Sequence, residues 1–374
     1  MIPKYVFRPI EYSDLNSFHD LIMTSKVGLT SLPKDKLALE KKIEKSVDSF
    51  NMTVIKPRDE LYLFVLEELM TQKIVGVAGI LASVGCDEPF YLFERQNINR
   101  TSDVLACDNH RDVLNLAIIR SGPTEIGSLY LHPNYRCQGL GRYISLSRFL
   151  FMAEHPNRFK KTVIAEMRGW CDANDQSPFW NCVGSHFFDM PFDQADQLSG
   201  INKQFIGDLV PRYPIYIALL PDHVQAVIGQ THPNTVPAIK LLESEGFEKT
   251  TAVDIFDAGP KVSCFLNQIR IVKEQSHTMN WQYYDIDDGQ PVFVSIGRLN
   301  DFKVYRSIAQ YNQNQLILPN SIFPLLEDET WLRWAPVKAF PYQNVLEDRQ
   351  SFVKRFSQWY HQLTTSLVDN FKGQ

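Results

Sequence analysis

One short stretch of this chain constrains its fold more than any other, the glycine-containing turn Arg136-x-x-Gly139-x-Gly141. It follows a strand-like run at residues 125–131 and precedes a strongly apolar stretch, residues 143–154, which predicts a helix. Backbone N–H groups converge at a helix N-terminus, so a strand that turns through glycines into a helix is typical of phosphate-binding sites. We therefore predict that this turn binds a phosphate-bearing cofactor or substrate.

Arginines near the turn could add charge-assisted contacts to the phosphates, and the candidates are Arg136, Arg142 and Arg148. Glycines let the backbone approach a ligand closely and adopt conformations that a Cβ would forbid. The spacing differs from the dinucleotide-binding GxGxxG pattern, and no Lys-Ser or Lys-Thr follows as a P-loop would require. On the pattern alone, a plain glycine turn before a core helix is an equally good interpretation.

The order of predicted elements indicates a mixed α/β (α+β) domain and not a helix bundle or a β-sandwich. Ser13 and Asp14 are predicted to cap the first helix. Residues 86–115 have weak periodicity and are predicted to form an insertion with some strand. The expected strands are 5–10, 61–66, 74–80, 125–131 and 161–167, and the expected helices are 15–23, 35–50, 143–154 and one from Pro178.

Two further segments follow this first domain, which we place at residues 1–190. The segment 191–272 contains a predicted helix with apolar residues on one face, and Gly246 is suited to end that helix. The segment 273–374 is predicted to be a β-rich tail that ends in a helix at about residues 345–371. No solenoid-type repeat is present in the sequence.

The composition excludes several classes of function. A net charge of −5 gives no basic footprint for nucleic acid. The six cysteines form no CxxC pair, and we expect no metal site and no disulfide framework. The sequence contains neither a signal-peptide pattern nor an apolar run long enough for a membrane span, so we expect a cytoplasmic protein with no membrane role.

The hairpin, the strand 125–131 and the RxxGxG turn together resemble motif A of the GCN5-related acyltransferase superfamily. This resemblance implies that the turn, through Arg136, Gly139, Gly141 and Arg142, binds the pyrophosphate of coenzyme A. It also implies that backbone N–H groups between Ser128 and Leu131 bind the acyl carbonyl group. Helices ending near Phe188 and at Gly246-Phe247 are similar to each other, which predicts an elaborated, partly duplicated acyltransferase fold with a β-rich C-terminal extension.

Within this superfamily the chain is similar to bacterial arginine N-succinyltransferases. The resemblance implies transfer of succinyl from succinyl-CoA to the α-amino group of L-arginine in arginine catabolism, with succinyl-CoA as co-substrate and no other cofactor. It also implies that His232 is the catalytic proton donor and that Leu129 contacts succinyl-CoA, with Leu131 beside it. The matching segments, which extend over roughly residues 5–270, are 28–33, 165–169, 177–180, 214–216, 227–233 and 254–260. Beyond residue 273 we find no segment-by-segment match.

Amide formation from a thioester needs a neutral amine and a protonated leaving thiolate, and histidine suits both proton transfers. We therefore expect His232 either to deprotonate the attacking ammonium or to protonate the departing CoA. The alternative is a structural role for His232, as a cap of the turn at Pro233 or as a packed side chain.

The acceptor and the succinyl group each need a charged partner. The guanidinium of arginine favours a carboxylate, and the candidates are Glu166, Asp254 and Asp257. The succinyl carboxylate should meet a cation or hydroxyl donors, for which we consider Arg168 and the pair Thr30 and Ser31. These carboxylates could instead be solvated or cap turns, and the two hydroxyls could cap the helix that begins near Asp35.

Two other functions fit the same residues. The chain could be a related amine N-acyltransferase that uses acetyl-CoA or an acceptor such as ornithine. It could also be a non-catalytic subunit that partners an active, related chain. We expect a homo- or hetero-oligomer in either case, and the presence of His232 with the RxxGxG turn argues against a silent chain.

Overall fold

The computed structural model describes residues 3–25, 31–172, 174–200, 202–312, 315–326 and 331–338. All but the last of these residues belong to one compact unit, Met1–Val337; the second unit is Lys338–Gln374. The predicted C-terminal helix at 345–371 lies outside the described residues. The proposed segments 1–190, 191–272 and 273–374 remain a prediction about sequence organisation.

A single mixed β-sheet runs through the first unit, in the order β14-β1-β2-β3-β6-β7-β10-β9 over its central part. Neighbouring strands are antiparallel except β6 and β7, which are parallel. These two pair only at Thr124↔Val163 and Glu125↔Ile164, so they diverge beyond that point. The central strands are β1 (Tyr5–Pro9), β2 (Leu61–Glu68), β3 (Lys73–Leu81), β6 (Thr124–Leu131), β7 (Thr162–Glu166), β9 (Glu248–Val253) and β10 (Pro260–Phe265).

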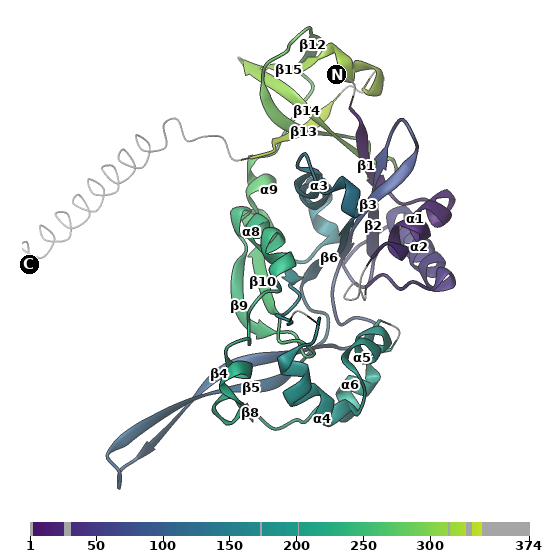
Figure 1. Cartoon of the computed structure of the whole chain (residues 1–374). Coiled ribbons are helices and arrows are strands. Elements are labelled where there is room, and N and C mark those ends of the chain that lie inside the picture. Colours follow the sequence, from purple (N-terminus) through teal and green to yellow (C-terminus); the bar gives the residue numbers. More distant parts are fainter. Residues whose placement is uncertain are drawn as a thin grey trace, which may run out of the picture. The chain divides into compact units, whose positions relative to one another are not determined.

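Helices cover both faces of this sheet. Helices α1 (Leu15–Met23) and α2 (Lys36–Asn51) bury Phe18, Ile43 and their neighbours against Leu63 and Val77. Helix α3 (Leu140–Glu154) packs on the opposite face, and Figure 1 shows α1 and α2 across β2 and β3 from it. The predicted order of strands and helices is confirmed, and the fold is mixed α/β with one large sheet, as predicted.

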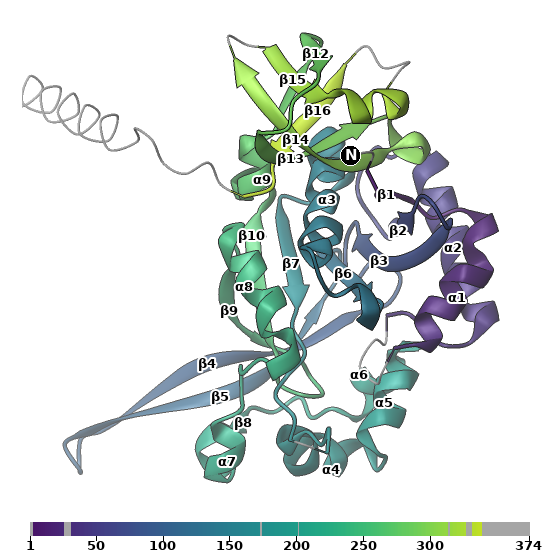
Figure 2. The ribbon, with the colours of Figure 1, turned by 45° about the horizontal axis from the view of Figure 1, so that its top comes forward.

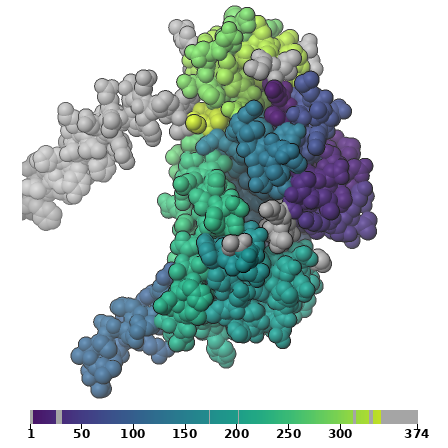
Figure 3. All heavy atoms as spheres, in the orientation of Figure 1, coloured from purple at the N-terminus to yellow at the C-terminus, as the bar shows by residue number. Residues whose placement is uncertain are grey.

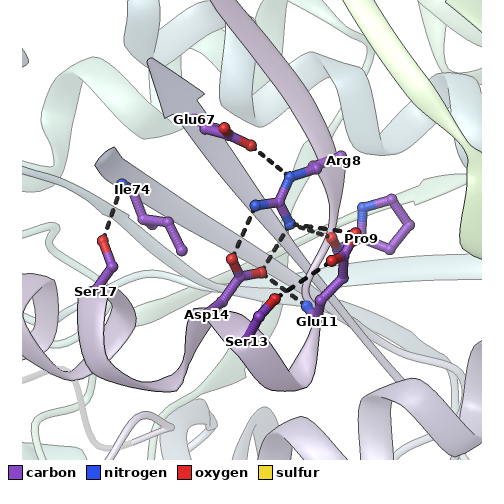
Figure 4. A network of polar contacts seen from close by, with 8 residues as sticks. All are labelled: Arg8, Pro9, Glu11, Ser13, Asp14, Ser17, Glu67 and Ile74. Atoms are coloured by element: carbon purple, nitrogen blue, oxygen red, sulfur yellow. Dashed lines mark hydrogen bonds and ion pairs between the residues drawn. The ribbon is translucent and has the colours of Figure 1, made fainter. Parts of the chain in front are cut away.

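A buried ionic network fixes the start of α1 to the sheet. The guanidinium of Arg8 donates to both carboxylate oxygens of Asp14, at 2.7 and 2.8 Å, and to Glu67 at 2.6 Å (Figure 4). Asp14 also accepts the backbone N–H of Glu11 at 2.8 Å. Asp14 does stand at the N-cap position of α1, as predicted, but its side chain makes no cap hydrogen bond to that helix. Its carboxylate accepts hydrogen bonds from Arg8 instead.

The predicted insertion is a long two-stranded hairpin, β4 (Phe90–Ser102) and β5 (Cys107–Ile119). Only its base is buried, and its outer part stands clear of the other described residues in Figure 3. Beside the base, a second core contains Phe179, Trp180 and Phe256. This region contains a five-residue π-helix (Trp180–Gly184), α4 (Ser185–Phe188), α5 (Phe192–Ser199), α6 (Gln204–Leu209), β8 (Ile215–Tyr216) and α7 (Asp222–Gln225).

The helix predicted before Gly246 is α8 (Val236–Ser244), and Gly246 has a φ of 97°, which suits a helix end. The β-rich tail continues the central sheet, because β14 pairs with β1 at Phe7↔Val304 (Figure 2). Its elements are α9 (Arg270–Glu274), β11 (Ser276–Thr278), β12 (Trp281–Tyr284), β13 (Gln290–Ile296), β14 (Lys303–Asn312), β15 (Gln315–Pro319) and β16 (Leu332–Pro336).

Candidate active site

His232 stands at the start of a short 3-10 helix, Pro233–Thr235, just beyond the end of β7. Its backbone N–H donates to the carbonyl oxygen of Arg168 at 2.8 Å, which holds it against the chain leaving β7. Its ring Nδ1 accepts the backbone N–H of Asn234 at 3.1 Å. The predicted capping role of His232 is therefore present in the structure, and it leaves Nε2 available for another role.

This hydrogen bond fixes the tautomer of the imidazole. An imidazole nitrogen that accepts a hydrogen bond carries no proton, so the neutral ring of His232 has its proton on Nε2. Nε2 lies 3.8 Å from Oδ1 of Asp175. In this state the ring offers a hydrogen-bond donor and no free basic nitrogen.

The surroundings of His232 favour the neutral ring. The residue is 6% exposed, and this burial lowers the pKa of His232 below its ordinary value of 6.5. The positive charge of Arg168 lowers the pKa further, and Asp175 raises it. The neutral form with Nε2–H is therefore the principal form at neutral pH.

Two polar groups beside His232 lack a partner. Among the described residues, the buried side-chain atoms without a hydrogen bond include Nε of Arg168 and Oγ1 of Thr231. The Nη2 atom of Arg168 lies 3.4 Å from Oδ1 of Asp175. Buried donors left unpaired are costly, so this pair is suited to a polar ligand group. Asp175 was not predicted from the sequence, since it follows no recognisable pattern and adopts a φ of 58° in a loop.

Asp257 connects the chain after β7 to the turn that precedes β10. Its two carboxylate oxygens accept the backbone N–H groups of Gly169 and Gly259, at 2.7 and 2.8 Å. A Cβ on Gly169 would lie 2.3 Å from the Asp257 carbonyl oxygen, so the close approach requires glycine. Asp254 likewise accepts backbone N–H groups, those of Phe256 and Asp257. In the structure both aspartates cap turns, which is the alternative that the sequence analysis left open.

Glu166, the last residue of β7, forms an ion pair with Lys261 on β10. The lysine is 2% exposed and its ammonium lies 4.6 Å from the centre of the Phe90 ring. Burial lowers the pKa of Lys261 to about 7, while the negative charge of Glu125 raises it. The Glu166 side chain is 33% exposed, so one side of this pair is open to a ligand.

Strand β6 contains a bulge where it pairs with β3. The register shifts between Val77↔Tyr130 and Gly79↔Gly127, and Ser128 has a φ of 50°. Its hydroxyl lies 3.0 Å from that of Ser31. Leu129 follows in the bulge, and Leu131 ends the strand. The other predicted hydroxyl, Thr30, lies outside the described residues.

The predicted phosphate turn leads directly into α3. Gly139 is the N-cap residue with a φ of 76°, and a Cβ on Gly141 would meet open space. Arg136 donates through Nε to the carbonyl oxygen of Leu131 at 3.1 Å, and its guanidinium lies over the Tyr130 ring, 5.7 Å from the ring centre. Burial lowers the pKa of Arg142, whose charged neighbours are Glu245 and Arg270.

The contacts of two arginines differ from what the sequence predicted. Arg148, considered as a phosphate contact, is 2% exposed beneath the sheet and donates to backbone carbonyl groups. It is too far along α3 and too buried to reach a phosphate at the helix N-terminus. Arg306, which was not predicted, donates from β14 to the carbonyl oxygen of Gln138 at 2.5 Å. The tail after residue 273 therefore contributes a cation to the turn.

Comparison with known proteins identifies the family of this chain. A family model described as "Arginine N-succinyltransferase beta subunit" matches residues 5–271, well over half of the chain. The chain belongs to this family. The predicted resemblance is thereby confirmed, and the chain is an acyltransferase.

Relatives of the family match over most of their length. The arginine N-succinyltransferase of Photorhabdus laumondii is 37% identical over 342 residues, which cover 91% of this chain and 99% of the relative. That of Yersinia pestis (strain Pestoides F) is 40% identical over 283 residues, 75% of this chain and 81% of the relative. The first alignment must extend beyond residue 273, where the sequence analysis found no match.

A solved structure shows the same fold. It is the arginine/ornithine succinyltransferase subunit AI from Pseudomonas aeruginosa, which is 33% identical to this chain with a TM-score of 0.82. The match covers 90% of this chain and 100% of that chain. The C-terminal strands therefore belong to the family's fold as well.

Two negative observations apply to the described part of this family member. No group of three or more His, Cys, Asp or Glu side chains in it could hold a metal ion. Nor does it contain a helix with the length and apolar character that crossing a membrane requires.

Proposed function

We propose that this chain transfers the succinyl group of succinyl-CoA to the α-amino group of L-arginine, giving N2-succinyl-L-arginine and CoA in arginine catabolism. The observation that carries the proposal is the environment of His232. A buried imidazole with its proton on Nε2 lies beside unpaired donors of Arg168 and Thr231, just after β7. Strand β7, which leads to this group, diverges from β6, the strand that contains the bulge at Ser128.

Succinyl-CoA binds along β6 in this proposal. The turn 136–141 and the N-terminus of α3 receive the pyrophosphate, with Arg136, Arg142 and Arg306 supplying positive charge. The thioester carbonyl accepts a backbone N–H from the bulge at Ser128 and Leu129. Succinyl-CoA is a co-substrate, and the reaction needs no further cofactor.

The reaction forms one bond and breaks one. The neutral α-amino group attacks the thioester carbon, and the tetrahedral intermediate then collapses with loss of the CoA thiolate. A C–N bond replaces a C–S bond, the amine loses a proton and the sulfur gains one. The proton that the amine loses passes to the departing sulfur, and the neutral ring of His232 keeps its own proton. His232 acts on the donor side, because Nε2–H can donate a hydrogen bond to the departing sulfur while Nδ1 is occupied by Asn234. This geometry favours a hydrogen-bond donor over the alternative role as the base.

The charged ends of the two substrates have different partners. The succinyl carboxylate binds at Nε of Arg168 and Oγ1 of Thr231, the two unpaired buried donors. The guanidinium binds Glu166, whose side chain is partly exposed. We prefer Glu166 to Asp254 and Asp257, because both oxygens of Asp257 and Oδ1 of Asp254 already accept backbone N–H groups.

The subunit names of the relatives support an oligomer. One is described as a beta subunit and another as subunit AI. We propose that this chain works as a homo-oligomer or with a related chain, which light scattering on the purified protein would distinguish from a monomer.

The test is an assay of CoA release with succinyl-CoA or acetyl-CoA against L-arginine, L-ornithine and L-lysine. The proposal predicts turnover mainly with succinyl-CoA and L-arginine. Ornithine is included because the Pseudomonas relative is described as an arginine/ornithine enzyme. Turnover with acetyl-CoA in preference to succinyl-CoA would overturn the donor. A folded chain that binds CoA without turnover would instead support the role of a non-catalytic subunit.

A further inference from the structure

Arg148 is a buried cation that the proposed mechanism leaves without a role. It lies in the middle of α3 and is 2% exposed. Its Nη1 atom donates to two carbonyl oxygens on neighbouring strands, Gly79 of β3 and Gly127 of β6, each at 3.2 Å. Its Nε and Nη2 atoms donate within its own helix, to the backbone oxygen and the hydroxyl of Ser145. The guanidinium thus joins α3 to two strands at one point.

That point is the bulge of β6. Gly79 and Gly127 are the paired residues at which the register shifts, and Ser128 follows with its φ of 50°. A Cβ on Gly79 would lie 3.0 Å from the Cβ of Ser128, so the strands approach closely here. In a regular ladder a strand carbonyl pairs with the next strand, whereas these two carbonyls accept from the guanidinium.

Peptide planarity links this contact to the other face of the sheet. The C=O of Gly127 and the N–H of Ser128 belong to one trans peptide, so they point in opposite directions. With the carbonyl directed at Arg148 on the α3 side, the N–H is directed away from α3, toward the side where Ser128 meets Ser31. A charged donor on the carbonyl also polarises the peptide and strengthens its N–H as a donor.

We propose that Arg148 is a positioning residue that orients and polarises the Ser128 peptide, so that its N–H binds the thioester carbonyl of the acyl donor. The inference rests on the proposed function. It assigns no contact between Arg148 and substrate, and the residue acts only through the backbone of the bulge.

The charge of Arg148 is uncompensated. Burial lowers its pKa to about 9 and is the only cause of the shift, so the guanidinium stays protonated at neutral pH with no carboxylate of the described residues acting on it. Burying a cation without a counter-ion costs free energy, so holding a helix on a sheet does not by itself explain this residue. Its positive charge beneath the acyl carbonyl favours the negative charge that develops on that oxygen in the transition state.

The test compares Arg148→Met with Tyr143→Phe, another change inside α3. Tyr143 donates its hydroxyl to the carbonyl oxygens of Val304 and Tyr5, at 2.5 and 3.2 Å, and so holds α3 to strands away from the bulge. We expect Arg148→Met to lower kcat about 10- to 100-fold, less than the ~10²–10³-fold loss from removing an oxyanion donor itself. The dissociation constant of CoA should stay unchanged, and Arg148→Lys should recover part of kcat. Tyr143→Phe should change thermal stability and leave kcat in place.

A spectroscopic readout separates positioning from loss of stability. Infrared spectra of succinyl-CoA labelled with carbon-13 at the thioester carbonyl are recorded on the protein without acceptor. The carbonyl band should lie below its position in water when bound to the wild type and to Tyr143→Phe. It should return toward that position in Arg148→Met. If Arg148→Met does not fold, Arg148→Lys and Ser145→Ala, which removes an acceptor of the guanidinium, are used in its place.

An unshifted kcat and carbonyl band in the folded Arg148 variants would overturn the inference. The inference would also be overturned if Tyr143→Phe lowered kcat as much as Arg148→Met for the same loss of stability. Failure of the proposed function is recognised separately, because the wild type would then show no turnover with succinyl-CoA and L-arginine.

Discussion

The segment His-Pro-Asn occurs three times in this chain, at residues 132–134, 155–157 and 232–234, and the first and last copies have almost the same geometry. His132 has φ and ψ of −52° and 135°, and His232 has −53° and 136°. Each precedes a three-residue 3-10 helix, and each Nδ1 accepts the N–H of the asparagine two residues on, at 3.2 and 3.1 Å. The three residues alone do not specify this turn, because His155 in the middle copy has φ and ψ of −125° and 53° and its side chain makes no cap hydrogen bond.

Their surroundings differ. His132 follows β6, and its ring packs edge-on against Tyr135 with ring centres 5.7 Å apart. His232 is buried beside Arg168 and Asp175, with unpaired donors close by. The comparison teaches that the turn fixes the tautomer of both rings, whereas long-range packing gives only His232 the buried polar neighbours on which its proposed role rests.

The largest expected difference concerns catalysis. His232→Ala should lower kcat about 10²- to 10³-fold, the usual loss when a hydrogen-bond donor to a developing negative charge is removed. The matched change His132→Ala removes the same cap from the other turn and should leave kcat near that of the wild type. Steady-state assays with saturating succinyl-CoA and L-arginine measure both. Equal losses of kcat in the two variants would mean that catalysis depends on the integrity of the turns and not on the surroundings of His232.

A smaller difference is expected for the arginines near the two histidines. Arg168→Met should raise the KM for succinyl-CoA about 10- to 100-fold, because a buried carboxylate loses a charged donor. The KM for acetyl-CoA, which has no such carboxylate, should change much less. Arg136→Met, near His132, should weaken both donors alike because the CoA phosphates are common to them. If Arg168→Met raised the KM for both acyl donors equally, Arg168 would not recognise the succinyl carboxylate.

The smallest effect concerns pH. Asp175 raises the pKa of His232, so Asp175→Asn should lower that pKa further below 6.5. Because the neutral ring is the active form, the acid limb of the kcat profile should move to lower pH. Arg168 acts in the opposite direction, and Arg168→Met should move the limb to higher pH. Measured pH profiles of kcat would contradict the assignment if Asp175→Asn moved the limb upward.

The sequence predicted the fold and part of the site. The order of strands and helices followed from apolar periodicity, and the glycines at 139 and 141 located the turn before α3. The role of His232 came from resemblance to a family, because a lone histidine carries no signal. The repeated His-Pro-Asn was visible in the sequence but could not have predicted the capping geometry, because His155 starts the same segment without a cap hydrogen bond.

The remaining features depend on contacts between residues far apart in the chain. Arg306 reaches Gln138 across 168 positions, and Asp257 holds Gly169 across 88. Arg148 lies 69 positions from Gly79. No local pattern marks such partners, so the phosphate role considered for Arg148 and the guanidinium role considered for Asp257 followed from charge alone.

The account's central claim is that a neutral His232 with its proton on Nε2 donates a hydrogen bond to the leaving group. Nitrogen-15 spectra of histidine-labelled protein at pH 7, assigned with His232→Ala, test it most directly. The account predicts a protonated Nε2 and an unprotonated, hydrogen-bonded Nδ1 for His232, with and without CoA. A ring protonated on both nitrogens, or on Nδ1 alone, would contradict it.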